Sequence, residues 1–239
     1  MKTVRFLILF ATVLSAAFIA GCSKDDDNVP AGDAQKFEAK SVQVPKAMSQ
    51  SNDPGAQMAT SYVNMINGLS GLASQMAPPG NNPGSISNGE RIFTWDVNDK
   101  TGIYTVKLVI KETGSEIIWD MYITGTMEGN VLDNFHYIHA VKQKDDSGSV
   151  FTVWDPDTGS KYMEISWSVI ANDSVKFIFE VFNETYLTVI VNSDNSGSIE
   201  LKEWLLGRYV TTYKASWAAS GHGEYWEYAN GVVDSNGSW

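Results

Sequence analysis

The sequence predicts a mainly β domain: an antiparallel up-and-down meander of ten or more strands forming a curved barrel or half-barrel, with one N-terminal amphipathic helix. Two observations predict this fold. From Glu90 onward, apolar and polar residues alternate with a period of two in segment after segment. Turn-forming runs such as DPDTGS, DNSG and NG separate these segments at short intervals.

The helix is expected over residues 54 to 76. Asp53 can cap its first turn, and Pro54 suits its first helical position. Apolar side chains then recur at steps of three and four, as on one face of a helix: Met58, Tyr62, Met65, Leu69, Leu72 and Met76. This stripe either completes a solid core or covers a cavity for an apolar ligand, and both interpretations stay open at this point.

The strands follow one another with tight turns between them. In GIYTVKLVIKE the apolar side chains fall on one face of a strand and the polar ones on the other. The segments SEIIWDMYITGT, SVFTVWD, KYMEISWSVIA, VKFIFEVF, TYLTVIV, SIELKEW, RYVTTYKASWAAS and GEYWEYANG behave alike. Because a large flat sheet would leave its apolar face in water, so many consecutive strands must curl or split into two packed sheets.

The chain divides into three parts. Residues 1–21 have a positive start, an apolar stretch and small residues before Cys22, which is the pattern of a secretory signal too short to span a membrane. Residues 22–52 are rich in Asp, Ser, Ala, Lys and Gln and are expected to form a flexible tether. Residues 53–239 are expected to form a single β-rich domain.

The run from Ile19 to Cys22, IAGC, resembles the lipobox of bacterial lipoproteins. The resemblance implies that Cys22 becomes the lipidated first residue of the mature chain and anchors it in outer-membrane lipid. The following SKDDD resembles the surface-export tag of Bacteroidota-type lipoproteins, which implies display on the cell surface. If SKDDD is only the start of a linker, the protein faces the periplasm.

The order of helix and meander is similar, in architecture alone, to the periplasmic lipoprotein-carrier family and less closely to lipocalins. No motif of either family stands in the sequence, and fold does not fix function. The first functional hypothesis is a lipid-anchored extracytoplasmic binding protein for an apolar small ligand or lipid. The alternative is a cell-surface adhesin or glycan-binding accessory lipoprotein that uses exposed aromatic side chains.

Composition narrows the possible partners. The chain has 17 Lys and Arg against 28 Asp and Glu, a formal net charge of −11, and removal of the signal would take away two more basic residues. A nucleic-acid partner is therefore not expected. The chain has 1 Cys, which the anchor uses, so no disulfide is expected to stabilise the domain. Protein partners cannot be named from the sequence.

No catalytic residue and no cofactor are predicted. His136 and His139 are three residues apart, a spacing that places them on opposite faces of a strand, so shared metal binding is not expected. His222 lies in a glycine-flanked turn far along the chain. Acidic residues such as Asp120 and Glu164 are interpreted as parts of solvated strand faces, and the protein is not expected to be an enzyme.

A calcium site is the most specific metal candidate. Residues 192–204, NSDNSGSIELKEW, resemble an EF-hand loop, which implies ligands at Asn192, Asp194, Ser196 and Glu203. The residue at the first ligand position is Asn instead of Asp, and a strand precedes the loop where the family has a helix. A plain hairpin turn explains the same residues, and it is the favoured interpretation.

Aromatic residues near the C-terminus are the other binding candidate. Tyr209, Tyr213 and Trp217 are evenly spaced, so they are expected on one strand face, and Trp226 lies in the next strand. If exposed, these side chains would form a platform on which sugars stack, whereas if buried they belong to the core. Burial is favoured because the opposite face of the same strand is more polar.

Overall fold

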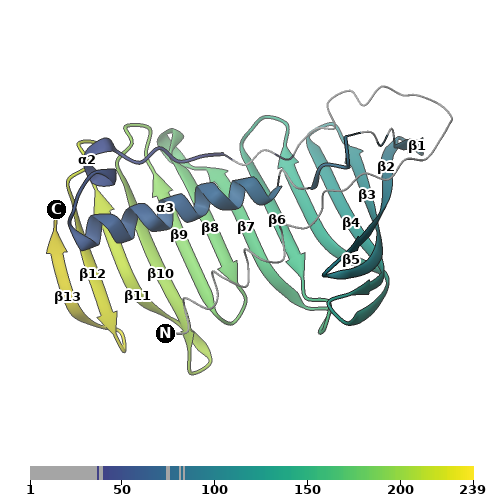
Figure 1. Cartoon of the computed structure of the whole chain (residues 1–239). Coiled ribbons are helices and arrows are strands. Elements are labelled where there is room, and N and C mark those ends of the chain that lie inside the picture. Colours follow the sequence, from purple (N-terminus) through teal and green to yellow (C-terminus); the bar gives the residue numbers. More distant parts are fainter. Residues whose placement is uncertain (1–36, 38–39, 74–75, 81, 83) are drawn as a thin grey trace.

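The computed structural model describes residues 37, 40–73, 76–80, 82 and 84–239. The predicted signal, Cys22 and SKDDD lie outside the described residues. In this described part of the chain, thirteen strands form one antiparallel sheet in which every strand pairs only with its neighbours in the chain, from β1 to β13 in order (Figure 1). β1 and β13 are the two ends of this order, so the sheet is an open, curved half-barrel and not a closed barrel.

The predicted meander is confirmed, and many of its turns lie where the turn-forming runs were noted. Short hairpin turns join most strands, and the 3₁₀ turn η2 (Ala171–Asp173) joins β7 to β8. The strands are β1 (Ser85–Ser87), β2 (Glu90–Asp99), β3 (Gly102–Glu112), β4 (Glu116–Met127), β5 (Asn130–Gln143), β6 (Gly148–Trp154), β7 (Lys161–Val169), β8 (Val175–Val181), β9 (Thr185–Val191), β10 (Gly197–Leu205), β11 (Arg208–Trp217), β12 (Gly223–Ala229) and β13 (Val232–Ser238).

The two faces of the sheet differ in what covers them. We call the face under the helix α3 (Pro54–Ala73) the inner face and the opposite one the outer face. In β4, Trp119, Met121 and Ile123 are buried on the inner face, whereas Asp120 and Tyr122, between them, point outward. The outer face is therefore the side on which polar and aromatic side chains remain accessible.

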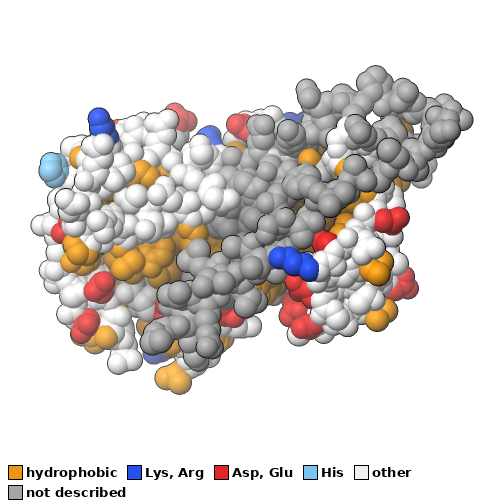
Figure 2. Space-filling model, viewed as in Figure 1, with side chains coloured by type: hydrophobic (Ala, Val, Ile, Leu, Met, Phe, Trp, Pro, Cys, Tyr) orange, Lys and Arg blue, Asp and Glu red, His pale blue; other side chains and the backbone are white. Residues whose placement is uncertain are grey.

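The helix α3 begins as predicted. Asp53 Oδ1 accepts hydrogen bonds from the backbone N–H groups of Gly55 (2.8 Å) and Ala56 (3.3 Å), which caps the first turn. The helix crosses the inner face over the C-terminal half of the sheet, and hydrophobic side chains are visible along its lower side (Figures 1 and 2). The most buried line of the helix consists of small and β-branched residues, Ala56, Ala59, Val63 and Ile66.

The segment before α3 differs from the predicted tether. Phe37, Val42 and Met48, the last in the short helix α2 (Lys46–Ser49), are buried at 0 to 6% exposure. Asn67 of α3 holds the backbone of Val42 with two hydrogen bonds, accepting from its N–H (2.7 Å) and donating to its C=O (2.9 Å). The described residues from Phe37 onward therefore pack with the domain, held by these apolar side chains and by the two backbone hydrogen bonds of Val42.

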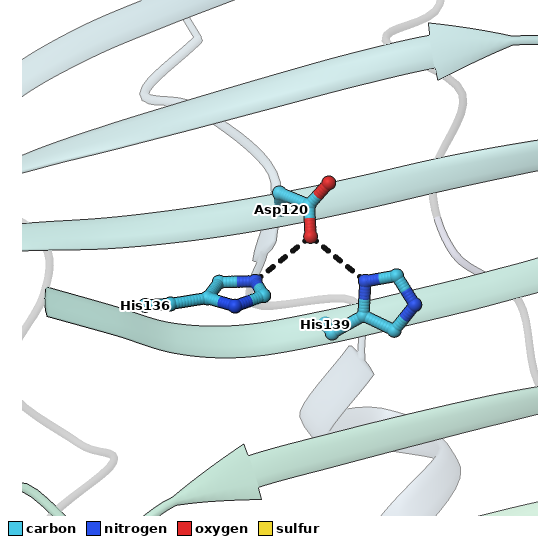
Figure 3. A group of neighbouring side chains, drawn as sticks. All are labelled: Asp120, His136 and His139. Carbon is cyan, nitrogen blue, oxygen red and sulfur yellow. Dashed lines mark hydrogen bonds and ion pairs between the residues drawn. The ribbon is translucent and has the colours of Figure 1, made fainter. Parts of the chain in front are cut away.

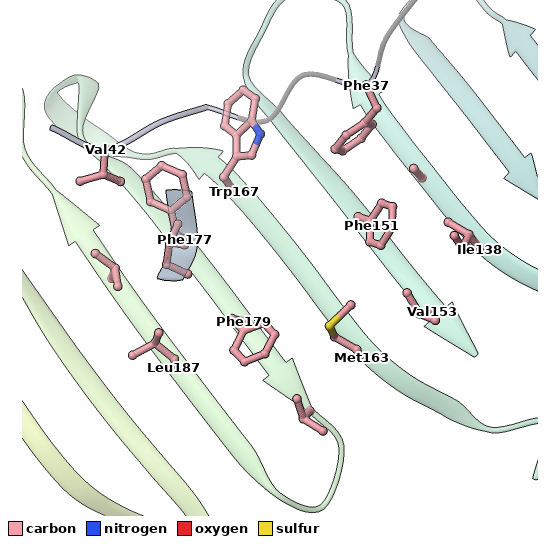
Figure 4. Close-up of a cluster of buried hydrophobic side chains, with 14 of the residues drawn as sticks. Phe37, Val42, Ile138, Phe151, Val153, Met163, Trp167, Phe177, Phe179 and Leu187 are labelled. Carbon is pink, nitrogen blue, oxygen red and sulfur yellow. The ribbon is translucent and has the colours of Figure 1, made fainter. Parts of the chain in front are cut away.

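One continuous core lies between the sheet and these covering segments. Phe37 and Val42 lie over side chains from successive strands, including Phe151, Trp167 and Phe177 (Figure 4). The ring of Phe37 meets Trp119 edge to face, with centroids 5.4 Å apart. Among the described residues, no helix is long and apolar enough to cross a membrane.

Candidate functional site

The predicted helix stripe does not coincide with the buried face of α3. Met58 is 39% exposed, Tyr62 and Met65 are half-buried, and Met76, beyond the end of the helix, is 3% exposed. Leu69 and Leu72 lie within α3, but their side chains are outside the described part of the chain. The residues that meet the sheet are smaller, so the helix lies close against it.

The predicted calcium ligands are not brought together. At the β9–β10 turn, Asn192 Nδ2 donates to Ser196 Oγ (2.9 Å), and the backbone N–H of Ser196 donates to Asp194 Oδ1 (2.9 Å). Glu203 instead pairs with Thr185 at the opposite end of this hairpin. At about 3.3 Å per residue, six residues of extended strand separate it from the turn. The segment has the form of a hairpin turn.

The predicted aromatic platform is split between the two faces of the sheet. In β11, Tyr213 pairs with Leu201 but Thr211 pairs with Lys202, so Thr212 is an extra, bulged residue. Tyr213 and Trp217, on one side of this bulge, are buried on the inner face, at 3% and 4% exposure. Tyr209 lies on the outer face instead, because a bulge reverses the alternation beyond it. Trp226 also lies on the outer face, opposite Lys214.

A different aromatic cluster occupies the outer face near the β10–β11 turn. It consists of Tyr186, Trp204 and Tyr209, and we call it the outer aromatic patch. The rings of Trp204 and Tyr209 meet edge to face at 5.0 Å, and Tyr186 lies 5.7 Å from Tyr209. Tyr209 donates its hydroxyl hydrogen to Glu180 Oε1 (2.8 Å), and burial together with this bond raises the pKa of Tyr209 to about 12. Trp204 remains 36% exposed.

The turn beside this patch is unusual in carrying exposed leucine. Leu205 is 40% exposed and Leu206 is fully exposed. Leu206 (φ 52°) and Gly207 (φ 81°) both have left-handed backbone angles, as the two central residues of a type I′ turn do. Asn-Gly is the preferred pair for this turn, since a leucine side chain is strained at positive φ.

We expect Leu206→Asn to raise the free energy of unfolding by about 1 kcal/mol, because asparagine tolerates the left-handed conformation. Urea denaturation monitored by tryptophan fluorescence measures the change. Leu205→Asn is the matched control, since it makes the same chemical change at a position without positive φ. An unchanged or lower stability for Leu206→Asn would contradict the strain.

A third cluster joins two histidines that were expected on opposite faces. In the pairing of β4 with β5, Met121 faces Ile138 and Tyr122 faces His136, so Tyr137 is a bulged residue. The bulge places His136 and His139 on the same outer face. The expectation of opposite faces is therefore wrong, because it assumed an uninterrupted strand.

Both imidazoles converge on one carboxylate (Figure 3). Asp120 Oδ1 lies 2.8 Å from Nε2 of His136 and 2.7 Å from Nδ1 of His139. The side chains of Asp120, His136 and His139 are 24%, 38% and 34% exposed. We call these three residues the His–Asp–His cluster. It brings together two ring nitrogens and one carboxylate oxygen, all of which can ligate a metal ion, at a surface that solvent can reach.

Neighbouring aromatic rings hold this cluster in place. The ring of His136 is stacked between Tyr122 (4.9 Å, 22°) and Trp154 (4.8 Å, 24°). Trp154 also meets the ring of His139 edge to face at 6.4 Å. Lys107 Nζ lies 5.5 Å from the Tyr122 ring centre, on its far side along the sheet. Three strands thus fix the orientation of His136.

Neither the His–Asp–His cluster nor the outer aromatic patch follows from simple strand alternation. One signal for the first stands in the sequence FHYIHAV, where Tyr137 and Ile138 are adjacent apolar residues. Two consecutive apolar residues within an alternating strand are what a bulge produces, since both can then turn inward. Tyr137 indeed packs against the core, and its burial raises its pKa to about 12.

Comparison with known proteins adds no family to this description. No protein-family model matches the chain, and no curated protein matches it significantly. Function must therefore be inferred from the clusters themselves.

Proposed function

We propose that this protein is a lipid-anchored extracytoplasmic binding protein that recognises glycans through the outer aromatic patch. The observation that carries the proposal is the position of Tyr186, Trp204 and Tyr209, whose rings gather on the outer face of the sheet, opposite α3. Indole and phenol rings combine a large apolar surface with a polar edge, as a sugar does with its C–H faces and hydroxyl groups.

Polar side chains border the patch and could hydrogen-bond sugar hydroxyls. Glu180 Oε1 already accepts from Tyr209, which fixes the phenol ring. Lys202 Nζ lies 5.8 Å from the ring centre of Tyr186. A stacking surface with a few placed polar groups is the usual composition of a site for small polar ligands.

The anchor rests on the sequence alone. Cys22 and the SKDDD run would tether the domain to outer-membrane lipid, with the domain displayed on the cell surface or facing the periplasm. Several acyl chains on one cysteine bury enough methylene groups, at about 0.8 kcal/mol each, for stable attachment. A tethered domain with an accessible binding face suits capture of polymers outside the cell.

The apolar-ligand hypothesis has weaker support. It needs space between α3 and the sheet, yet the inward residues Ala59 and Val63 are 0% exposed and belong to the continuous core. Within α3, Met58 of the predicted stripe is instead exposed and Met65 half-buried, and Met76 is buried beyond the end of the helix. These observations favour the solid-core interpretation of the helix.

We expect Trp204→Ala to weaken glycan binding at least about tenfold, which is a loss of about 1.4 kcal/mol. A glycan array probed with the full chain identifies the ligand, and titration followed by tryptophan fluorescence measures the affinity. Trp226→Ala is the matched control, since Trp226 is also an outer-face tryptophan but lies outside the patch. Equal binding by Trp204→Ala and the parent, or no glycan bound at all, would overturn the proposal.

A further inference from the structure

We propose that the His–Asp–His cluster binds a divalent first-row transition cation, for which Zn²⁺ is the appropriate probe. This inference is independent of glycan binding, because it concerns different residues on different strands. Nothing in the outer aromatic patch is needed for it.

The donor atoms are already close to a coordinating arrangement. One oxygen of Asp120 and one ring nitrogen from each histidine all lie within 4.8 Å of one another. Zinc binds imidazole nitrogen and carboxylate oxygen at about 2.0 to 2.2 Å, so tetrahedral ligand atoms are separated by roughly 3.3 Å. Asp120 Oδ1 is 2.8 Å from His136 Nε2 and 2.7 Å from His139 Nδ1. These two separations need to widen by about half an ångström to admit the ion.

The supporting structure limits how far the ligands can move. His136 is held between two aromatic rings, and His139 is bounded by Trp154 on one side. The bulge at Tyr137, which brings the histidines onto one face, interrupts the backbone pairing of β5 with β4. Bulges that redirect side chains in this way are frequent near functional sites. Ligands held on strands by packed neighbours lose little freedom when an ion binds.

The ligand types select the class of cation. Imidazole nitrogen suits zinc, copper, nickel and iron, whereas calcium and magnesium prefer sites built wholly from oxygen. Three protein ligands leave at least one coordination position, and the partial exposure of all three side chains opens that position to solvent. Water or an oxygen of a bound molecule can fill it. The net charge of −11 also favours the approach of cations to this protein.

Isothermal titration of the full chain with Zn²⁺, without a histidine tag and after treatment with a chelator, tests the proposal. We expect one ion per chain. His139→Gln and Asp120→Asn should each weaken its affinity by at least about 100-fold, since loss of a mere supporting group costs 10- to 100-fold. Both substitutions keep a polar side chain of similar size at a partly exposed position, so far-ultraviolet circular dichroism should show an unchanged fold. His222→Ala removes the remaining histidine and should bind Zn²⁺ as the parent does.

X-ray absorption of the zinc-loaded parent supplies a measurement that needs no variant. We expect a first shell of nitrogen and oxygen with the outer-shell scattering of two imidazoles. A shell without imidazole, unchanged affinity in His139→Gln, or displacement of zinc by equimolar Ca²⁺ or Mg²⁺ would each overturn the proposal. In that event the three residues form only a hydrogen-bonded cluster.

Discussion

We expect Trp119→Ala to lower the free energy of unfolding by about 3 to 5 kcal/mol, which is the usual cost of truncating a fully buried aromatic side chain. Trp119 is 2% exposed in β4, and its ring packs edge to face with that of Phe37 from the N-terminal segment. Alanine would leave a cavity beside the ring of Phe37. The N-terminal segment would then lose one of its main contacts with the sheet.

Equilibrium unfolding in urea, followed by circular dichroism, measures this loss. Trp226→Ala is the matched control, since the same truncation on the outer face removes only a half-buried ring and should cost far less. A loss for Trp119→Ala no greater than that of the control would contradict the burial of Trp119 between the sheet and the N-terminal segment.

The second large effect is expected where α3 meets β12. We expect Gly55→Ala to destabilise the domain by about 1 to 3 kcal/mol, as overpacking of a filled core does. A Cβ atom at Gly55 would overlap three carbons of the Tyr225 ring. That ring cannot easily retreat, because Gly237 and the stacked Trp239 lie against it. The backbone C=O of Gly55 also accepts a hydrogen bond from the hydroxyl of Tyr213 (3.2 Å).

The same substitution at Gly68 should have the opposite sign. A Cβ at Gly68 meets nothing within 4 Å, so Gly68→Ala only adds helix propensity and should stabilise by about 0.5 to 1 kcal/mol. Thermal melting of both variants against the parent measures the pair. If Gly55→Ala does not lower the melting temperature, the close approach of α3 to Tyr225 is contradicted.

The strands could be predicted because their signal is local. Alternation in β3 and a turn on either side specify one hairpin at a time, and the cap at Asp53 specifies the start of α3 in the same way. β13 carried little such signal, since most of its residues are polar and exposed. It is a strand because β12 offers it a pairing edge. The packing of Phe37 was missed for a similar reason, because nothing near it in the sequence indicates its distant partner.

The candidate sites could not be predicted because two bulges decide which side chains share a face. One extra residue, Tyr137, unites His136 with His139, and another, Thr212, separates Tyr209 from Tyr213. A shift of one residue reverses every side chain beyond it, so a small local irregularity changes the surface entirely. Whether a bulge forms depends on how the strand packs against both of its neighbours. The alternation of apolar and polar residues along one strand contains no information about that packing.

The strictly sequential pairing of the sheet also sets an order of assembly. Each strand needs only the hairpin before it, so the sheet can grow from β1 toward β13 while the rest of the chain is still emerging. The helix α3 is made before any strand, yet Gly55 is bonded to Tyr213 across 158 residues. We therefore expect α3, although it is made before the strands, to dock last, which leaves the part of the inner face beneath it uncovered until synthesis or export of the chain is nearly complete.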